Sequence, residues 1–88
     1  MARTLILGNE SNLLAGIGNS TTVDSATVVR VVNDSGSAVV LYVQDSTYTG
    51  IGSITLPNNT IELIEKKSSD LIYGNGGALK VAKVGFTG

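Results

Sequence analysis

The chain has 88 residues, of which 42% are hydrophobic and 15% charged, and its formal net charge is −1. It contains no cysteine and no histidine, which excludes disulfides, thiolate zinc sites, cysteine nucleophiles and a Ser-His-Asp triad. A chain of this length holds a single hydrophobic core, and its few basic residues form no stripe that would bind nucleic acid or an anionic membrane.

The first 25 residues are the least regular part of the sequence. Residues 2–8 predict a short strand, but the following GNESNLLAGIGNSTT is broken up by glycine, asparagine and serine. We therefore expect residues 1–25 to form an irregular N-terminal arm or long loop that orders on binding. The spacing of Leu13, Leu14 and Ile17 allows one helical turn within it.

Two β-branched runs follow, ATVVRVVND at residues 26–34 and AVVLYVQD at residues 38–45. Both are apolar on nearly both faces, which predicts the central strands of a small sandwich. The DSGS segment between them predicts a turn in which Gly36 adopts a positive φ.

The stretch IGSITLPNNTIELIEKK, residues 51–67, predicts a β-hairpin whose two strands are joined at the paired asparagines. Pro57 lies at a strand end, where its missing N–H removes no ladder hydrogen bond. Alternation places Ile61 and Leu63 on one face and Lys66 on the other. The charged end EKK is predicted to be solvated and to keep a sheet edge soluble.

The C-terminal part predicts one more strand after the irregular segment SSDLIYGNGG. In ALKVAKVGFTG, Leu79 and Val81 share one face, whereas Val84 and Phe86 share the other. A phase slip near Ala82 would bring all four inward, so we predict a β-bulge there.

These patterns together predict an all-β protein without a sustained helical period. We expect a small antiparallel β-sandwich or partly closed barrel of five to six strands, formed by residues 26–88 and preceded by the arm.

Polar motifs between the strands are best interpreted as turns. Asp24-Ser25, Asp34-Ser35 and Asp45-Ser46 would have to gather around calcium to form a metal site, but aspartate and serine also end strands by bonding their own backbone. We favour the turn interpretation, and extend it to the four N-x-S/T sequons, which begin at Asn9, Asn19, Asn33 and Asn58.

No combination of residues predicts catalysis. Glu62 and Glu65 are three positions apart on a strand, so their carboxylates point to opposite faces and do not form an acid/base pair. The glycine-rich segments 16–21 and 74–77 lack the context of phosphate-binding loops and are interpreted as turns. The sequence therefore predicts no catalytic, cofactor-binding or metal-binding residue, and a protein that is not an enzyme.

The tyrosines leave a binding function open. Tyr42 lies in a core-like strand and is interpreted as structural, whereas Tyr48 and Tyr73 are expected on loops, where they could serve an interface. A soluble sandwich that binds carbohydrate or another protein is therefore an alternative.

From residue 26 onward the chain resembles small virion proteins of tailed bacteriophages, particularly those of marine bacteria and cyanobacteria. The segments that carry the resemblance are TVVRVVNDSGSAVVLYV, IGSITLPNNTIELIEKKSSDLIYG and the closing ALKVAKVGFTG. They cover about two thirds of the chain and do not include the N-terminal arm.

This resemblance implies a structural subunit of the virion without an active site. We expect a capsid decoration or cement protein, oligomeric and bound to the major capsid protein or other virion proteins, with a place in the neck, tail or baseplate as the alternative. The apolar run 5–7 is too short for a signal peptide or a membrane span, so synthesis in the host cytoplasm is expected, without cofactor, nucleic acid or membrane as partner.

Overall fold

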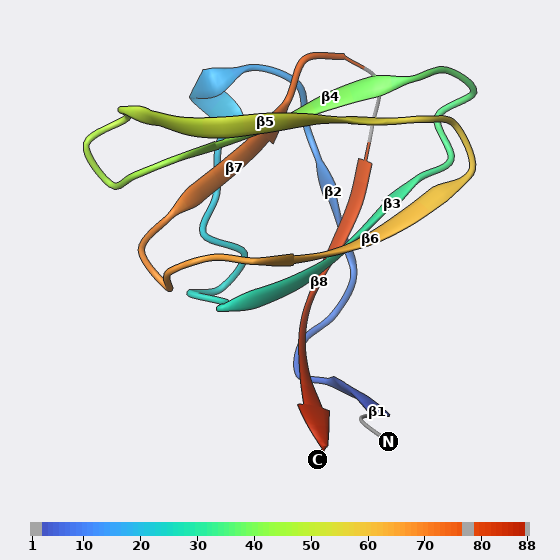
Figure 1. The fold of residues 1–88 in the computed structure, drawn as a ribbon, viewed down its shortest axis with the longest axis vertical. Helices are drawn as coiled ribbons and strands as arrows, with labels where there is room; N and C mark the ends of the chain where they lie inside the picture. The colour runs from blue at the N-terminus through green and yellow to red at the C-terminus, as the bar shows by residue number, and fades with distance from the viewer. Residues whose placement is uncertain (1–2, 77–78, 88) are drawn as a thin grey trace.

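The computed structural model describes residues 3–76 and 79–87, and these form two antiparallel β-sheets packed face to face (Figure 1). The all-β prediction is confirmed, and the sheets do not close into a barrel. The described strands number eight: β1 Arg3–Ile6, β2 Ser11–Leu13, β3 Val28–Asn33, β4 Val39–Gln44, β5 Gly50–Leu56, β6 Thr60–Glu65, β7 Leu71–Gly74 and β8 Leu79–Thr87.

The two predicted central strands are central, but they lie in different sheets. One sheet has the order β1-β8-β3-β6, with β2 also pairing with β8, and the other has the order β5-β4-β7. The turn between β3 and β4 contains Gly36 at φ 97°, as predicted, and carries the chain from one sheet to the other.

Apolar side chains from both sheets form one core. Its largest buried members are Leu13, Leu41, Leu56, Ile72 and Leu79, all essentially without solvent exposure. Full burial of such a side chain is worth about 1.5–3 kcal/mol, so each of these residues contributes substantially to the stability of a small domain.

The expected N-terminal arm is wrong for residues 11–23. Strand β2 pairs with β8 from Ser11 opposite Val81, and Leu13 at its end is only 1% exposed. Further along, Thr21 pairs with Ile72, and Val23 belongs to the core. Only a short 3-10 turn, η1 Ile17–Asn19, stands where a helical turn was allowed. A segment rich in glycine and asparagine is thus ordered by the intramolecular pairing it makes.

The predicted hairpin over residues 51–67 is also wrong. Strand β5 pairs with β4, and β6 pairs with β3, so the two strands belong to opposite sheets. Alternation was predicted correctly, because Ile61 and Leu63 lie on one face of β6 and Ile64 packs toward the core from the other. The turn at the paired asparagines therefore crosses between layers.

The predicted bulge in β8 is absent. Residues Lys80 to Lys83 pair one for one with β3. The irregularity lies instead in the neighbouring strand, where four residues separate Ile6 from Ser11 while two separate their partners Val84 and Val81. Beyond this kink, β1 and the end of β8 form a two-stranded ribbon that projects from the sandwich (Figure 1).

None of the helical structure in residues 3–76 and 79–87 is long and apolar enough to cross a membrane.

Candidate functional site

An apolar hollow lies on the outer face of the larger sheet. We call it the outer hollow. Its apolar lining comes from β1, β6 and β8 and consists of Ile6, Ile61, Leu63, Ala82 and Val84. Its volume is about 470 Å³. Ile61 and Leu63 face solvent here, although the same strand β6 turns Ile64 toward the core. A sandwich needs only one apolar face per sheet, so this second apolar face is available for an interaction.

The ribbon extends this apolar surface away from the body of the protein. All four residues of β1 are exposed, and Ile6 reaches 82% exposure. Leu5, Leu7 and Phe86 are exposed as well. A two-stranded ribbon is marginally stable alone in water, so contact with another surface would stabilise it.

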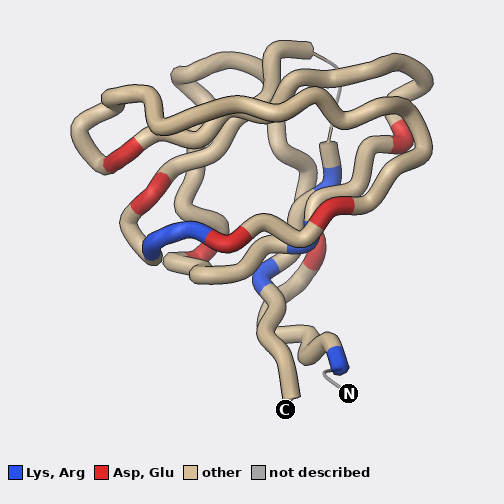
Figure 2. Tube along the Cα trace, in the orientation of Figure 1, with Lys and Arg blue, Asp and Glu red and all other residues tan. Residues whose placement is uncertain are grey.

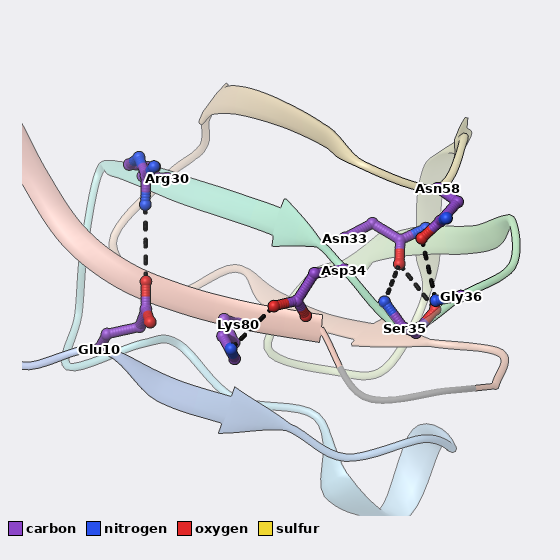
Figure 3. Close-up of polar contacts among 8 residues, drawn as sticks. All are labelled: Glu10, Arg30, Asn33, Asp34, Ser35, Gly36, Asn58 and Lys80. Atoms are coloured by element: carbon purple, nitrogen blue, oxygen red, sulfur yellow. Dashed lines mark hydrogen bonds and ion pairs between the residues drawn. The ribbon is translucent and has the colours of Figure 1, made fainter.

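Two ion pairs lie on or beside this sheet (Figure 3). Arg30 and Glu10 line the outer hollow and form an ion pair of 3.5 Å between Nη1 and Oε2. At the other end of the sheet, Lys80 donates to Asp34 over 2.8 Å, and this bond lowers the pKa of Asp34. Both pairs are exposed, so they orient side chains more than they stabilise the fold.

The smaller sheet has a different outer surface, with no charged residue in β4, β5 or β7 (Figure 2). All three tyrosines of the chain line one hollow of about 400 Å³, which we call the tyrosine hollow. Tyr42 of β4 and Tyr73 of β7 are cross-strand neighbours, and their rings stack with centroids 4.9 Å apart and planes 12° from parallel.

Tyr48 is held at the rim of this hollow by a tightly bonded turn. The Oδ1 atom of Asp45 accepts hydrogen bonds from the backbone N–H groups of Thr47 and Thr49 and from the Thr47 hydroxyl. These bonds lower the pKa of Asp45, the Thr47 hydroxyl contributing most. Tyr48 itself has φ 65° and is 61% exposed, an unfavourable backbone conformation for a bulky residue.

The prediction that Tyr73 lies on a loop is wrong, because it belongs to strand β7. Tyr42 lies in the central strand β4, as predicted. Tyr42 points out of its strand at the same sheet surface as Tyr73, because the two are paired in register. Sequence alternation places Tyr42 opposite to Leu41, which is buried, and this signal would have identified the outward side.

Lys66 departs from the expected solvated edge, since it is only 7% exposed. Its Nζ atom donates to the carbonyl oxygens of Ala26, at 2.7 Å, and Lys67, at 3.3 Å. Burial lowers the pKa of Lys66, and the nearby Asp70 carboxylate opposes that shift. The ammonium group thus holds together the segments that enter β3 and leave β6.

Two buried or bridging asparagines have the turn role that was predicted for them (Figure 3). Asn33 donates from Nδ2 to the carbonyl oxygens of Ser37 and Leu56. Its Oδ1 atom accepts from Ser35 (Figure 3). Asn58 accepts a bond from the backbone of Gly36 at 2.9 Å. These bonds join the two places where the chain crosses between sheets.

The three Asp-Ser pairs lie in turns and do not converge. Asp45 bonds its own turn as predicted, whereas Asp34 pairs with Lys80 and leaves the turn bonding to Asn33. Asp24 and Ser25 are both at positive φ, and the backbone N–H of Ser25 donates to the hydroxyl oxygen of Thr22. Among the described residues, no group of three or more acidic side chains could hold a metal ion.

The glutamate pair of β6 and the two glycine-rich segments were interpreted as structural, and their described residues agree with this interpretation. Glu62 and Glu65 lie three positions apart in the regular strand β6 and therefore on opposite faces. The segment 16–21 contains η1, and Gly16 donates its N–H to the carbonyl of Gly74. Part of the segment 74–77 lies outside the described residues.

Comparison of the chain with protein-family models, curated proteins and solved structures finds no match.

Proposed function

We propose that this protein is a structural subunit of a bacteriophage virion, and specifically a capsid decoration protein that binds the major capsid protein lattice. The observation that carries the proposal is the exposed apolar surface formed by the outer hollow and the ribbon. The resemblance of residues 26–88 to small phage virion proteins supports the same assignment.

The exposed side chains are of the kind that a stable interface buries. Ile6, Ile61 and Leu63 are large, apolar and exposed on one sheet face, and Phe86 extends the surface along the ribbon. Contiguous apolar surface of this kind marks interaction sites in soluble proteins. The Glu10–Arg30 ion pair at the hollow supplies a polar contact that would fix orientation in the complex.

An unprotected strand edge supports an oligomer as well. Strand β5 is the edge of the smaller sheet, carries no charge, and exposes Ile51 and Ile54. The opposite edge, β7, is bridged by Ala15 and Thr21, and the β6 edge of the larger sheet carries Glu62 and Glu65. Uncharged edge strands pair readily with other chains, so we propose that copies of the subunit associate through β5.

The proposal is tested by binding of purified protein to shells of the major capsid protein, measured by co-sedimentation. Leu63→Lys places a charge in the outer hollow and is expected to weaken binding at least about tenfold. Glu62→Lys, on the opposite face of the same strand, is the matched control and should bind as the unchanged protein does.

Equal binding by all three proteins would overturn the role of the outer hollow. Absence of binding to shells, together with binding to isolated necks or tails, would replace the decoration role by the alternative place in the virion.

A further inference from the structure

The tyrosine hollow has the features of a ligand site, and it shares no lining residue with the outer hollow. It lies on the smaller sheet, whereas the outer hollow lies on the larger one. Aromatic residues from two strands and one turn meet there, although aromatic side chains make up only 5% of the chain. We propose that the tyrosine hollow binds an uncharged saccharide.

The chemistry of the lining selects this class of ligand. None of the described residues that line the hollow is charged, so a phosphate, nucleotide or anionic lipid would be desolvated without a counter-charge. A neutral sugar ring presents apolar C–H groups on its faces and hydroxyls around its rim. The tyrosine rings can pack against the former, while the phenol hydroxyls and the Ser53 hydroxyl can bond the latter.

Gly50 is one of the residues that line the hollow. A Cβ atom built on Gly50 would meet no atom within 4 Å, and the φ of Gly50 is not positive. A side chain at this position would therefore be added to the wall of the hollow without colliding with neighbouring atoms or straining the backbone. The size of about 400 Å³ lies at the small end of the range for ligand pockets.

Tyr48 gives an independent indication. Its positive φ is unfavourable, yet the Asp45 turn holds it there with the ring largely exposed. Glycine would adopt this backbone conformation without strain and would serve folding better. Strained residues held in place by their surroundings are concentrated at functional sites, and here the strain positions an aromatic ring beside the stacked pair Tyr42–Tyr73.

The test is titration of the full chain with cellohexaose, laminarihexaose, maltohexaose and chitohexaose. Binding is measured by isothermal titration calorimetry and by tyrosine fluorescence. The tyrosine signal is not masked by tryptophan, because the chain has none. At least one oligosaccharide is expected to bind. Gly50→Val, which adds an apolar side chain to the wall of the hollow, and Tyr48→Gly should each weaken binding at least about tenfold. Thr55→Val, on the same strand but outside the hollow, should leave it within about twofold.

Stability separates a binding role of Tyr48 from a structural one. Tyr48→Gly is expected to unfold at the same or a higher temperature than the unchanged protein, because the substitution relieves strain. A lower unfolding temperature with unchanged saccharide binding would overturn the assignment. Failure of all four oligosaccharides to bind at millimolar concentration would overturn it as well, and so would binding of a polyproline peptide in their place. These outcomes are independent of the shell-binding test.

Discussion

Asn33 of β3 donates from Nδ2 to the carbonyl oxygen of Leu56 at the end of β5 over 2.7 Å, so a fully buried amide links the two sheets. The link lies where both crossovers between the layers meet, because the backbone of Asn59 also donates to the Asn33 carbonyl at 2.7 Å. A buried polar group with this many partners specifies one arrangement of the crossovers.

Removal of this amide should cost much of the stability of the domain. Asn33→Ala leaves the buried Leu56 carbonyl without its donor, and we expect a loss of about 2 kcal/mol or more in the free energy of unfolding, measured by urea denaturation. Asn19→Ala, which removes an exposed amide bond to the Ala15 carbonyl, is the control and should cost well under half as much. Equal losses would contradict the role of Asn33 as the link between the sheets.

Adjacent leucines test the integration of the N-terminal segment. Leu13 is 1% exposed and Leu14 is 56% exposed. Leu13→Ala should lower the free energy of unfolding by about 2–5 kcal/mol, because it leaves a cavity in the core. Leu14→Ala should change it by no more than about 0.5 kcal/mol. A tolerated Leu13→Ala would restore the idea of a detachable arm.

Buried Lys66 should make stability depend on pH. Its folded-state pKa lies below the ordinary 10.5 of the unfolded chain, so between these two values the unfolded state binds more protons. The free energy of unfolding should therefore rise with pH in this interval. Below the interval Lys66 is protonated in both states, so its contribution does not change with pH. The slope should be smaller in Lys66→Met and unchanged in the neighbouring Lys67→Met, as measured by chemical denaturation at a series of pH values. An unchanged slope in Lys66→Met would contradict the burial of the charged group.

The Asp45 turn gives a prediction on the acidic side. Since hydrogen bonds lower the pKa of Asp45 below 3.8, the bonds stabilise the turn above that value and are lost as pH falls through the lowered pKa. Thr47→Val removes the hydroxyl that contributes most, so it should raise the Asp45 pKa toward 3.8, as followed by carboxyl-carbon NMR. Ser46→Ala should leave the pKa where it is. No change in Thr47→Val would show that the hydroxyl does not bond the carboxylate.

The class of fold could be predicted from local pattern, because β-branched runs and turn residues report the conformation of each segment. The two central strands and the positive φ of Gly36 follow from such local signals. Partner choice is not local. The paired asparagines after Pro57 would suit a hairpin, but pairing of β5 with β4 and of β6 with β3 decides that they join two layers instead.

The candidate sites could be predicted less well, for the same reason. Tyr42, Tyr48 and Tyr73 are far apart in sequence, and only the pairing of β4 with β7 brings the first and third together. Strand β2 has only three residues and little β propensity, and its order comes from pairing with β8. The alternation of residues in β6 showed that Ile61 and Leu63 share one face. When both faces of a strand carry apolar residues, however, the local sequence does not tell which face is buried in the core.

The proposed role as a structural subunit of the virion predicts a defined copy number of this chain in purified particles. Quantitative mass spectrometry would compare it with the major capsid protein in the same sample. We predict a simple, constant stoichiometric ratio to the capsid protein, as repeated sites on a lattice require. Absence of the chain from purified particles would show that it is not a subunit of the virion.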